Sequence, residues 1–320
     1  MRTRLTDLLG IEHPVMLAGM GGVSYHRLVA AVSEAGGFGT LGASTMGDDL
    51  PAEIAAVKNL TAKPFGVDLL TALPGQVEHG VQAIVDGGAA AFIAGLGVPR
   101  EVIDELHRHG ILVGSMCGKV RHAVAAVEGG CDFVVAQGTE AGGHTGQVAA
   151  MALVPQVVDA VGARVPVVAA GGLYDGRGLA AALALGADGV WVGTRFIATP
   201  EARAVAGYKD ALLRLAEDGT TVSRAYTGKT CRVVRNSYTQ YFETHPGELK
   251  PFPEQAIESI RTGASHLGAP DGTAVDVDRE FFPCGQGVGA IQELLPAAQI
   301  VHEMVATAEA QLARLAPANR

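Results

Sequence analysis

The sequence predicts an α/β fold in which eight parallel strands alternate with helices and close into a (β/α)8 TIM barrel. Short apolar runs recur about every 20 to 25 residues, which is the length of one strand, one helix and two short loops. The runs are continuous rather than alternating, as is typical of strands buried on both faces of a parallel sheet. The eight runs are Val15–Ala18, Phe38–Leu41, Phe65–Leu70, Ala91–Ala94, Ile111–Gly114, Phe133–Ala136, Val167–Ala170 and Val190–Val192.

Amphipathic stretches between the runs predict the helices of the barrel. Examples are Tyr25–Ala35, Asp48–Leu60 and Pro99–His109, in which Glu, Arg and His take the polar side. Glycine pairs such as Gly129-Gly130 follow several of these stretches, and glycine supplies the left-handed residue that ends many helices. An open, doubly wound parallel sheet is the alternative fold, because the same β/α units can build either architecture.

The repeating pattern stops near residue 200. We expect residues 201–280 to form a smaller, mostly helical substrate domain inserted after the eighth strand. This segment is more charged, and Val205–Leu215 and Glu254–Ile260 have helical periodicity. The barrel domain then consists of residues 1–200 plus 281–320, and Gln286–Ala313 forms helices that close the ring.

The composition excludes several classes of protein. Of 320 residues, 48% are hydrophobic and 18% are charged, so the chain can bury a large core and is not disordered. The net charge of -9 argues against nucleic acid or an anionic membrane as a partner, and no apolar run is long enough to span a bilayer. Four cysteines without CxxC spacing and an N-terminus without a secretory signal predict a cytoplasmic protein. We expect small-molecule substrates, and a homodimer is compatible with the sequence.

Two consecutive strands end in glycines, and this pattern predicts a phosphate site. Val167–Ala170 is followed by Gly171-Gly172, and the next strand is followed by Gly193-Thr194. In a barrel these are the ends of strands seven and eight, where phosphate groups commonly bind to peptide N–H groups and helix termini. Ordinary tight turns would explain one glycine pair, whereas two matched units favour a phosphate-bearing cofactor.

A glycine-rich loop after the sixth strand carries the candidate catalytic residue. The segment Gln137–Gly146 can bring backbone against a flat ligand, and its His144 is the side-chain type best suited to proton transfer near neutral pH. By contrast, Gly37–Gly42 matches G-x-G-x-x-G, but its last glycines fall within the second predicted strand, so it is not a dinucleotide fingerprint. The histidines show no metal-ligand spacing, so we expect no metal site.

Three basic residues form the remaining candidate group. If their segment is helical, Arg232 and Arg235 share a face and Lys229 lies nearby. The group could then contact an anionic substrate, but a solvated helix face explains the same pattern equally well.

Six motifs spread along the chain occur together. They are Pro14-Val15-Met16-Leu17-Ala18-Gly19-Met20, Ala35-Gly36-Gly37-Phe38-Gly39, Gln137-Gly138-x-Glu140-Ala141-Gly142-Gly143-His144-x-Gly146, Ala170-Gly171-Gly172-x-x-Asp175-Gly176-Arg177-Gly178, Gly193-Thr194-Arg195-Phe196 and Cys284-Gly285-Gln286-Gly287. As a set they resemble the signature of the nitronate monooxygenase (2-nitropropane dioxygenase-like) family. The resemblance covers residues 1–200 well, is looser over 201–280 and resumes at about residue 281.

The resemblance implies an FMN-dependent barrel and gives each matching residue a role. His144 would lie over the reactive face of the flavin and act in catalysis. The FMN phosphate would be held by Gly171, Gly172, Gly193 and Thr194. The residues implied to lie against or beside the flavin ring are Ala18, Gly19, Met20, Gln137, Gly138, Gly143 and Gln286.

One position departs from the pattern of the family. Asp68 ends the third strand, where many relatives carry Asn. A carboxylate near the flavin pyrimidine would oppose the negative charge that develops there on reduction, so it would need a cation or its own proton. Asp68 is therefore a candidate flavin contact that alters the flavin potential.

The resemblance leaves three functions open. Oxidation of alkyl nitronates with O2, which yields a carbonyl compound and nitrite, ranks first because it is the namesake activity of the family. The alternative is NAD(P)H-dependent reduction of enoyl thioesters, carried by coenzyme A or acyl carrier protein, or of quinones; fold and flavin do not decide between these reactions. A non-catalytic flavin-binding protein is the third hypothesis, and the intact His144 loop argues against it.

Overall fold

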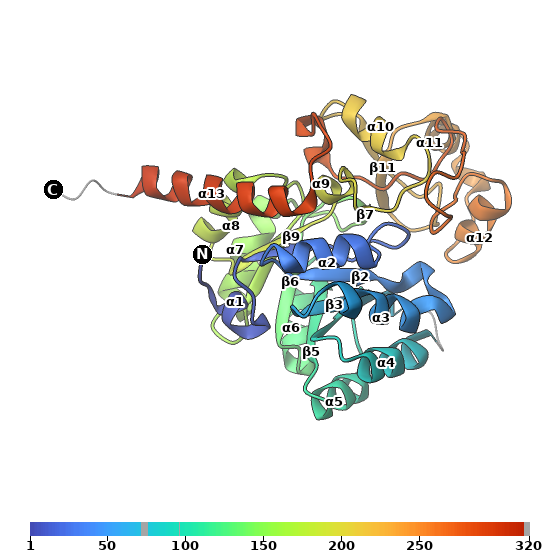
Figure 1. The fold of residues 1–320 in the computed structure, drawn as a ribbon. Helices are drawn as coiled ribbons and strands as arrows, with labels where there is room; N and C mark the ends of the chain where they lie inside the picture. The colour runs from blue at the N-terminus through green and yellow to red at the C-terminus, as the bar shows by residue number, and fades with distance from the viewer. Residues whose placement is uncertain (72–75, 96, 317–320) are drawn as a thin grey trace.

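The computed structural model describes residues 1–71, 76–95 and 97–316, and its centre is a barrel of eight parallel strands (Figure 1). The strands are β1 (Val15–Leu17), β2 (Gly39–Gly42), β3 (Phe65–Leu69), β4 (Ala91–Ala94), β5 (Leu112–Cys117), β6 (Phe133–Gln137), β8 (Val167–Ala170) and β9 (Gly189–Val192). They pair in the order β1-β9-β8-β6-β5-β4-β3-β2, and a parallel bridge between Met16 and Phe38 joins β1 to β2. Each strand overlaps one predicted apolar run, so the (β/α)8 prediction is confirmed and the open-sheet alternative is wrong.

Helices surround the strands and complete the barrel. They are α2 (His26–Glu34), α3 (Leu50–Leu60), α4 (Gln76–Gly87), α5 (Arg100–Arg108), α6 (Val120–Gly129), α7 (Ala150–Val161), α8 (Gly176–Ala184) and α13 (Ala297–Leu315). The last helix, α13, packs against α8 and α2 and so takes the eighth position in the ring (Figure 1). The shorter elements are α1 (Arg4–Leu9), α9 (Thr194–Ile197) and the 3₁₀ turns η1 (Ala43–Thr45), η2 (Gly47–Asp49), η3 (Pro246–Glu248) and η4 (Gln286–Ala290).

The hydrophobic core has one layer inside the barrel and another between strands and helices. Phe38, Phe133 and Trp191 belong to the inner layer, together with Leu5 and Leu9 of α1. Since α1 precedes β1, it closes the amino-terminal end of the barrel. Full burial of a side chain such as Phe133 stabilises the fold by roughly 2–3 kcal/mol. The opposite, carboxyl-terminal end remains for a functional site.

The segment after α9 combines helices with a small antiparallel sheet, so it is not mostly helical as predicted. Its elements are α10 (Tyr208–Arg214), β10 (Thr220–Ser223), β11 (Cys231–Val234), α11 (Ser237–Thr244) and α12 (Glu254–Arg261). β11 pairs with β10 and with β7 (Gly143–His144), a two-residue strand in the loop after β6. The segment has its own buried cluster, which includes Tyr226, Val233 and Phe281. In Figure 1 this yellow-to-orange region gathers at one side of the barrel.

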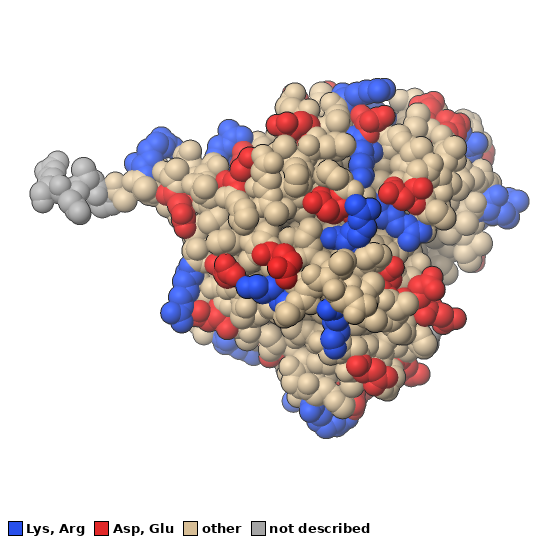
Figure 2. Space-filling view, viewed as in Figure 1, with Lys and Arg blue, Asp and Glu red and all other residues tan. Residues whose placement is uncertain are grey.

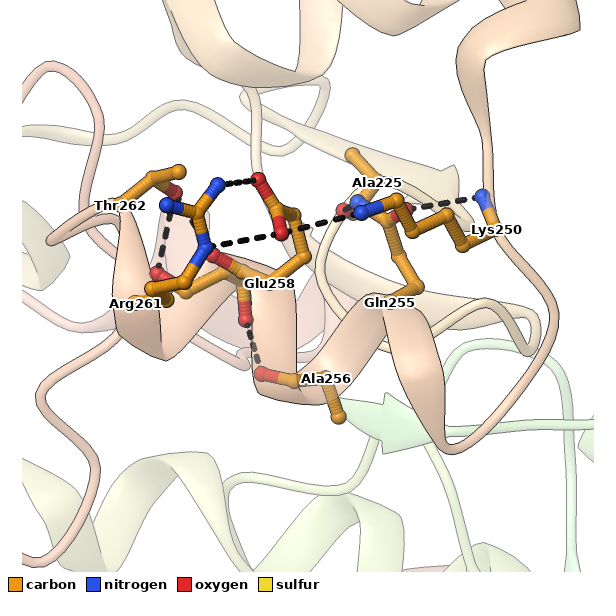
Figure 3. A network of polar contacts seen from close by, with 8 residues as sticks. Ala225, Lys250, Gln255, Ala256, Glu258, Arg261 and Thr262 are labelled. Atoms are coloured by element: carbon orange, nitrogen blue, oxygen red, sulfur yellow. Dashed lines mark hydrogen bonds and ion pairs between the residues drawn. The ribbon is translucent and has the colours of Figure 1, made fainter.

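A polar network fixes α12 within this region (Figure 3). Glu258 accepts hydrogen bonds from Lys250 (3.0 Å) and from Arg261 (2.5 Å). The amide of Gln255 donates to the carbonyl oxygen of Ala225 (2.6 Å) and accepts from the backbone of Lys250 (2.9 Å). These contacts tie α12 to the chain between β10 and β11 without using any predicted site residue.

The outer surface carries charges of both signs. Figure 2 shows Lys and Arg intermixed with Asp and Glu across the visible face. Among the described residues, no helix combines the length and the apolar character that crossing a bilayer requires. The four cysteines, Cys117, Cys131, Cys231 and Cys284, are free and buried.

Candidate active site

A cavity of about 260 Å³ opens at the carboxyl ends of the barrel strands. The region beyond the barrel covers it through Tyr208, Leu267 and Phe281. The predicted site residues that line this cavity are Ala18, Gly19, Met20, Asp68, Gln137, Gly143, His144, Gly171, Gly172, Gly193 and Thr194. They come from the ends of five different strands, and the parallel barrel is what brings them together.

Two predicted residues lie beside the cavity rather than in its wall. The Gly138 N–H donates to the carbonyl oxygen of Ala170 (2.9 Å), within the barrel. Gln286 is exposed, and its backbone N–H donates to the carbonyl oxygen of Glu140 (2.9 Å). The predicted flavin contacts of Gly138 and Gln286 therefore stay predictions.

Unpaired peptide donors form one rim of the cavity. Gly171 and Gly172 follow β8 with left-handed backbones, at φ of 104° and 72°. Within the described part of the chain, the peptide N–H groups of both glycines have no hydrogen-bond acceptor, and the same holds for Gly193 and Thr194 at the end of β9. Four unpaired peptide donors at neighbouring strand ends can bind an anion such as phosphate.

The signature loop is held in place by its own backbone and by the returning chain. Both carboxylate oxygens of Glu140 accept from the N–H of Ala150 (3.0 and 2.9 Å), at the start of α7. The N–H of Gly285 donates to the Thr194 hydroxyl (2.9 Å), while Gly142 packs so closely on Cys284 that no side chain would fit. The glycines of the motif thus permit the loop, the end of β9 and residues 284–286 to stack at the cavity.

Asp68 places a carboxyl group in the cavity wall. It packs directly on Gly19, where a Cβ atom would lie only 2.1 Å from the Cβ of Asp68. Burial raises the pKa of Asp68 to about 8, with no contribution from a neighbouring charge. The carboxyl is therefore mostly protonated at neutral pH, so it does not bring a negative charge into the cavity.

His144 is held by both the barrel and the outer region. Its strand, β7, pairs with β11, in the register His144 to Cys231. The amide of Gln137 donates to the carbonyl oxygen of His144 (3.0 Å). Burial, and secondarily the positive charge of Lys229, lower the pKa of His144. The imidazole is therefore neutral at neutral pH.

Thr227 assigns the tautomer of His144. The Thr227 hydroxyl donates to the carbonyl oxygen of Lys229 (3.2 Å), so its oxygen accepts from Nε2 of His144 (3.0 Å). This network puts the ring proton on Nε2 and leaves Nδ1 as an acceptor. Sequence reasoning did not find Thr227, because it is far from the histidine motif in sequence and belongs to no motif itself.

The three basic residues Lys229, Arg232 and Arg235 do not form one group at the site. Its segment is the strand β11 and not a helix, so the helical interpretation is wrong. Arg232 is buried, and its guanidinium donates to the carbonyl oxygen of Thr139 (2.9 Å) and to the Thr220 hydroxyl (3.1 Å). Arg235 is exposed. Arg232 thus supports the signature loop from behind.

Large apolar side chains that carry no motif also line the cavity. They are Met116, Leu173, Tyr174, Ile197, Trp191, Tyr208, Leu267 and Phe281. Their position beside the glycine rim gives a cavity with one anion-binding edge and otherwise apolar walls. This combination fits a flat cofactor that ends in a phosphate. The fold and the site therefore define a barrel protein whose cavity suits a phosphate-bearing ring compound.

Comparison with known proteins agrees with this description. The family described as nitronate monooxygenase matches residues 2–83 and 75–307, so the chain belongs to the nitronate monooxygenase family. A probable nitronate monooxygenase of Staphylococcus saprophyticus is 34% identical over 318 residues, covering 84% of this chain and 89% of the relative. The structure of FabK from Thermotoga maritima superposes with a TM-score of 0.89 at 35% identity, covering 98% of each chain.

A third relative has a different named activity. The (3aS,4S,5R,7aS)-5-hydroxy-7a-methyl-1-oxo-octahydro-1H-indene-4-carboxyl-CoA dehydrogenase of Rhodococcus jostii is 42% identical over 251 residues, covering 78% of this chain and 70% of the relative. These relatives are named as oxidoreductases, and this chain is an oxidoreductase. The family is flavin-dependent and uses FMN, and the four unpaired peptide donors and the apolar walls of the cavity fit that group.

Proposed function

We propose that this chain is an FMN-dependent oxidoreductase that acts on an acyl thioester of coenzyme A. The observation that carries the proposal is that the unpaired N–H groups of two strand ends and the neutral His144 line the same cavity. FMN, when bound, supplies the two-electron redox chemistry, while the protein supplies orientation and electrostatics.

The chain's own residues divide into those that hold the cofactor and those that act on substrate. Gly171, Gly172, Gly193 and Thr194 would hold the phosphate through their peptide N–H groups. Ala18, Gly19 and Met20, which line the same cavity, would contact the ring. Asp68 would contact the cofactor as a neutral carboxyl, a role consistent with its raised pKa.

His144 positions the substrate and handles its proton. A neutral imidazole whose Nε2–H is held by Thr227 keeps Nδ1 free as an acceptor, and protonation there makes the ring a donor. In the reducing direction NAD(P)H is the electron donor, and the double bond of an enoyl thioester gains a hydride equivalent at one carbon and a proton at the other. His144 polarises the thioester carbonyl or moves that proton.

The substrate class is supported by the relatives and by the outer region. The dehydrogenase relative is named for a CoA thioester and has the highest identity of the relatives described above. We propose that residues 201–280 form the substrate domain, because Tyr208, Cys231 and Leu267 face the cavity from it. A substrate held there is enclosed by apolar side chains opposite the barrel.

Oxidation of alkyl nitronates is the second candidate function. The family match and the probable nitronate monooxygenase of Staphylococcus saprophyticus favour it. The unpaired peptide N–H groups at the ends of β8 and β9 supply hydrogen-bond donors to the cavity, and a small nitronate needs no second substrate site.

Two assays on the same enzyme distinguish these functions. One follows NAD(P)H oxidation with a short enoyl-CoA as acceptor, and the other follows nitrite release from an alkyl nitronate in the presence of O2. We expect turnover in the first assay. Nitrite release without any thioester-dependent NAD(P)H oxidation would replace the thioester proposal with the nitronate reaction.

A further inference from the structure

A second cavity, of about 540 Å³, adjoins the first one. Gly95, Met116, Gln137 and His144 line both, so these residues form a shared wall. The remaining wall of the second cavity comes from β5, from α6 and the residues just before it, and from the loops after β4, after β7 and before β11. The proposed function places the cofactor and the reacting end of the substrate in the first cavity, so it assigns no ligand to the second one.

The charged groups that line the second cavity are all basic. They are Lys119 and Lys229; His122 and His144 also line the cavity, and no aspartate or glutamate occurs among the described residues of its wall. Neither lysine forms an ion pair with a described residue, and the Nζ of Lys229 lies 4.2 Å from the centre of the Phe252 ring. The cavity therefore has positive charge that the protein does not compensate.

The two histidines respond to this charge. The pKa of His122 is lowered by partial burial and by the positive charges of Arg121 and Lys119. The pKa of His144 is lowered by burial and by Lys229. Each lysine thus creates a positive electrostatic potential at one of the histidines that line the cavity, although the two lysines are far apart in sequence. An anion that enters the cavity would be attracted by both lysines.

We infer that the second cavity binds the phosphate-bearing arm of the organic substrate whose reacting end lies beside His144. This inference rests on the proposed function, because it assumes a substrate with a reacting end in the first cavity. The shared wall gives such a molecule a continuous course, with its reacting end by His144 and its phosphates between Lys119 and Lys229. Paired lysines bind phosphate as point charges, and Lys119 also stands at the start of α6, where peptide N–H groups favour anions.

Two substrates of the proposed reaction carry suitable phosphates. Coenzyme A has a diphosphate and a 3′-phosphate on the arm that leads to the thioester, and NADPH has a diphosphate and a 2′-phosphate on the arm that leads to the nicotinamide. The shared chemistry is a phosphorylated nucleotide at the end of a long arm. Binding measurements with each compound separate the two sources.

The test is isothermal titration of the FMN-loaded enzyme with coenzyme A, pantetheine and NADPH. The variants are Lys119→Ala and Lys229→Ala. The matched control is Lys63→Ala, because Lys63 pairs with Glu12 (2.9 Å) just before β3, at the opposite end of the barrel. We expect each cavity variant to weaken coenzyme A binding roughly tenfold, the effect of one charge-assisted contact. Pantetheine, which lacks the phosphates, should bind equally to all forms.

The outcomes separate the inference from the proposed function. If NADPH but not coenzyme A loses affinity in the cavity variants, the phosphates are those of the nicotinamide nucleotide and the assignment of the cavity holds. The assignment of the cavity would be overturned if Lys119→Ala and Lys229→Ala bound coenzyme A and NADPH as tightly as wild type does. It would also be overturned if Lys63→Ala lost as much affinity as the two cavity variants. Thioester turnover that continues unchanged in Lys119→Ala and Lys229→Ala would leave the proposed function intact while removing the cavity from it.

Discussion

The two cavities at the carboxyl ends of the barrel strands differ in the groups that they offer to an anion. The first offers neutral peptide N–H groups at the ends of β8 and β9, and its carboxyl group, Asp68, is mostly protonated. The second offers the uncompensated side chains of Lys119 and Lys229. Backbone donors are fixed by the fold and suit a group that stays bound, whereas flexible lysines suit a molecule that enters and leaves. This difference supports our proposal that the first cavity holds a resident cofactor and the second an exchanging substrate.

The most damaging change to the first cavity is Gly172→Val. A branched side chain is strained at φ of 72°, and it stands where the phosphate approaches the peptide N–H groups. We expect FMN affinity to fall by at least about 100-fold and activity to disappear. The measurement is the flavin absorbance of the purified protein after dialysis.

The control for this change is Gly263→Val. Gly263 has φ of 69° but follows α12, and a side chain there meets no neighbouring atom. It carries the same backbone strain without touching the cavity, so its flavin content should match wild type. A Gly172→Val protein that keeps its full flavin content would contradict the assignment of the phosphate to this rim.

The role of His144, which lines both cavities, is tested by His144→Ala. Loss of proton transfer by this side chain should lower turnover by roughly 10²–10⁴ while flavin stays bound, because the rim at β8 and β9 is unaltered. His109→Ala, which removes an exposed imidazole after α5, is the control and should keep full turnover. Turnover is measured at saturating substrate together with flavin absorbance. Equal turnover in the His144 variant would remove this residue from the mechanism.

The neutrality of the first cavity is tested by Asp68→Asn. Since the pKa of Asp68 is raised from 3.8 to about 8, the folded protein binds a proton that the unfolded chain releases between these values. Wild-type stability should therefore decline as pH rises from 4 to 8, by at most about 1.4 kcal/mol per pH unit, and then level off. Urea unfolding at several pH values measures this.

The Asp68→Asn substitution removes the titration, so the stability of this variant relative to wild type should grow over that interval. Asp104→Asn replaces an exposed carboxyl on the outer face of α5, far from the cavity, and should track wild type. If wild type and Asp68→Asn show parallel pH profiles, the carboxyl is ionised in the folded protein and the first cavity is not neutral.

The smallest effect is expected outside both cavities, at Glu258. Its partners Lys250 and Arg261 lower the pKa of Glu258 from 4.5 to about 2, but the group lies at the surface with both partners exposed, so solvent screens the network (Figure 3). Glu258→Gln should cause a slight loss of thermal stability that is present above pH 4.5 and vanishes as pH falls towards 2. Flavin content and turnover should not change. Altered nucleotide binding in this variant would show that the outer region and the cavities are coupled.

The sequence predicted the barrel because each strand is a local feature. The run Phe133–Ala136 is apolar on both faces and becomes β6, and the glycines after Val167–Ala170 become the unpaired rim. Such patterns can be recognised from residues that are neighbours in the sequence. The glycines and His144 of the first cavity were predictable for the same reason, because they lie in short motifs directly after strands.

The features that the sequence did not predict depend on contacts between distant parts of the chain. The pairing of β7 with β11 turns residues 231–234 into a strand and buries Arg232, which local periodicity had assigned to a helix face. The second cavity was not predicted, since Lys119 and Lys229 share no motif and meet only through the folded barrel. Thr227, which fixes the tautomer of His144, was missed for the same reason.

An anaerobic titration of the flavin absorbance distinguishes thioester reduction from nitronate oxidation. The enzyme is first mixed with NAD(P)H and then with an enoyl-CoA, and a second sample is mixed with an alkyl nitronate alone. We expect NAD(P)H to bleach the flavin and the enoyl-CoA to restore its absorbance. Bleaching by the nitronate, with NAD(P)H and the thioester both without effect, would contradict this expectation.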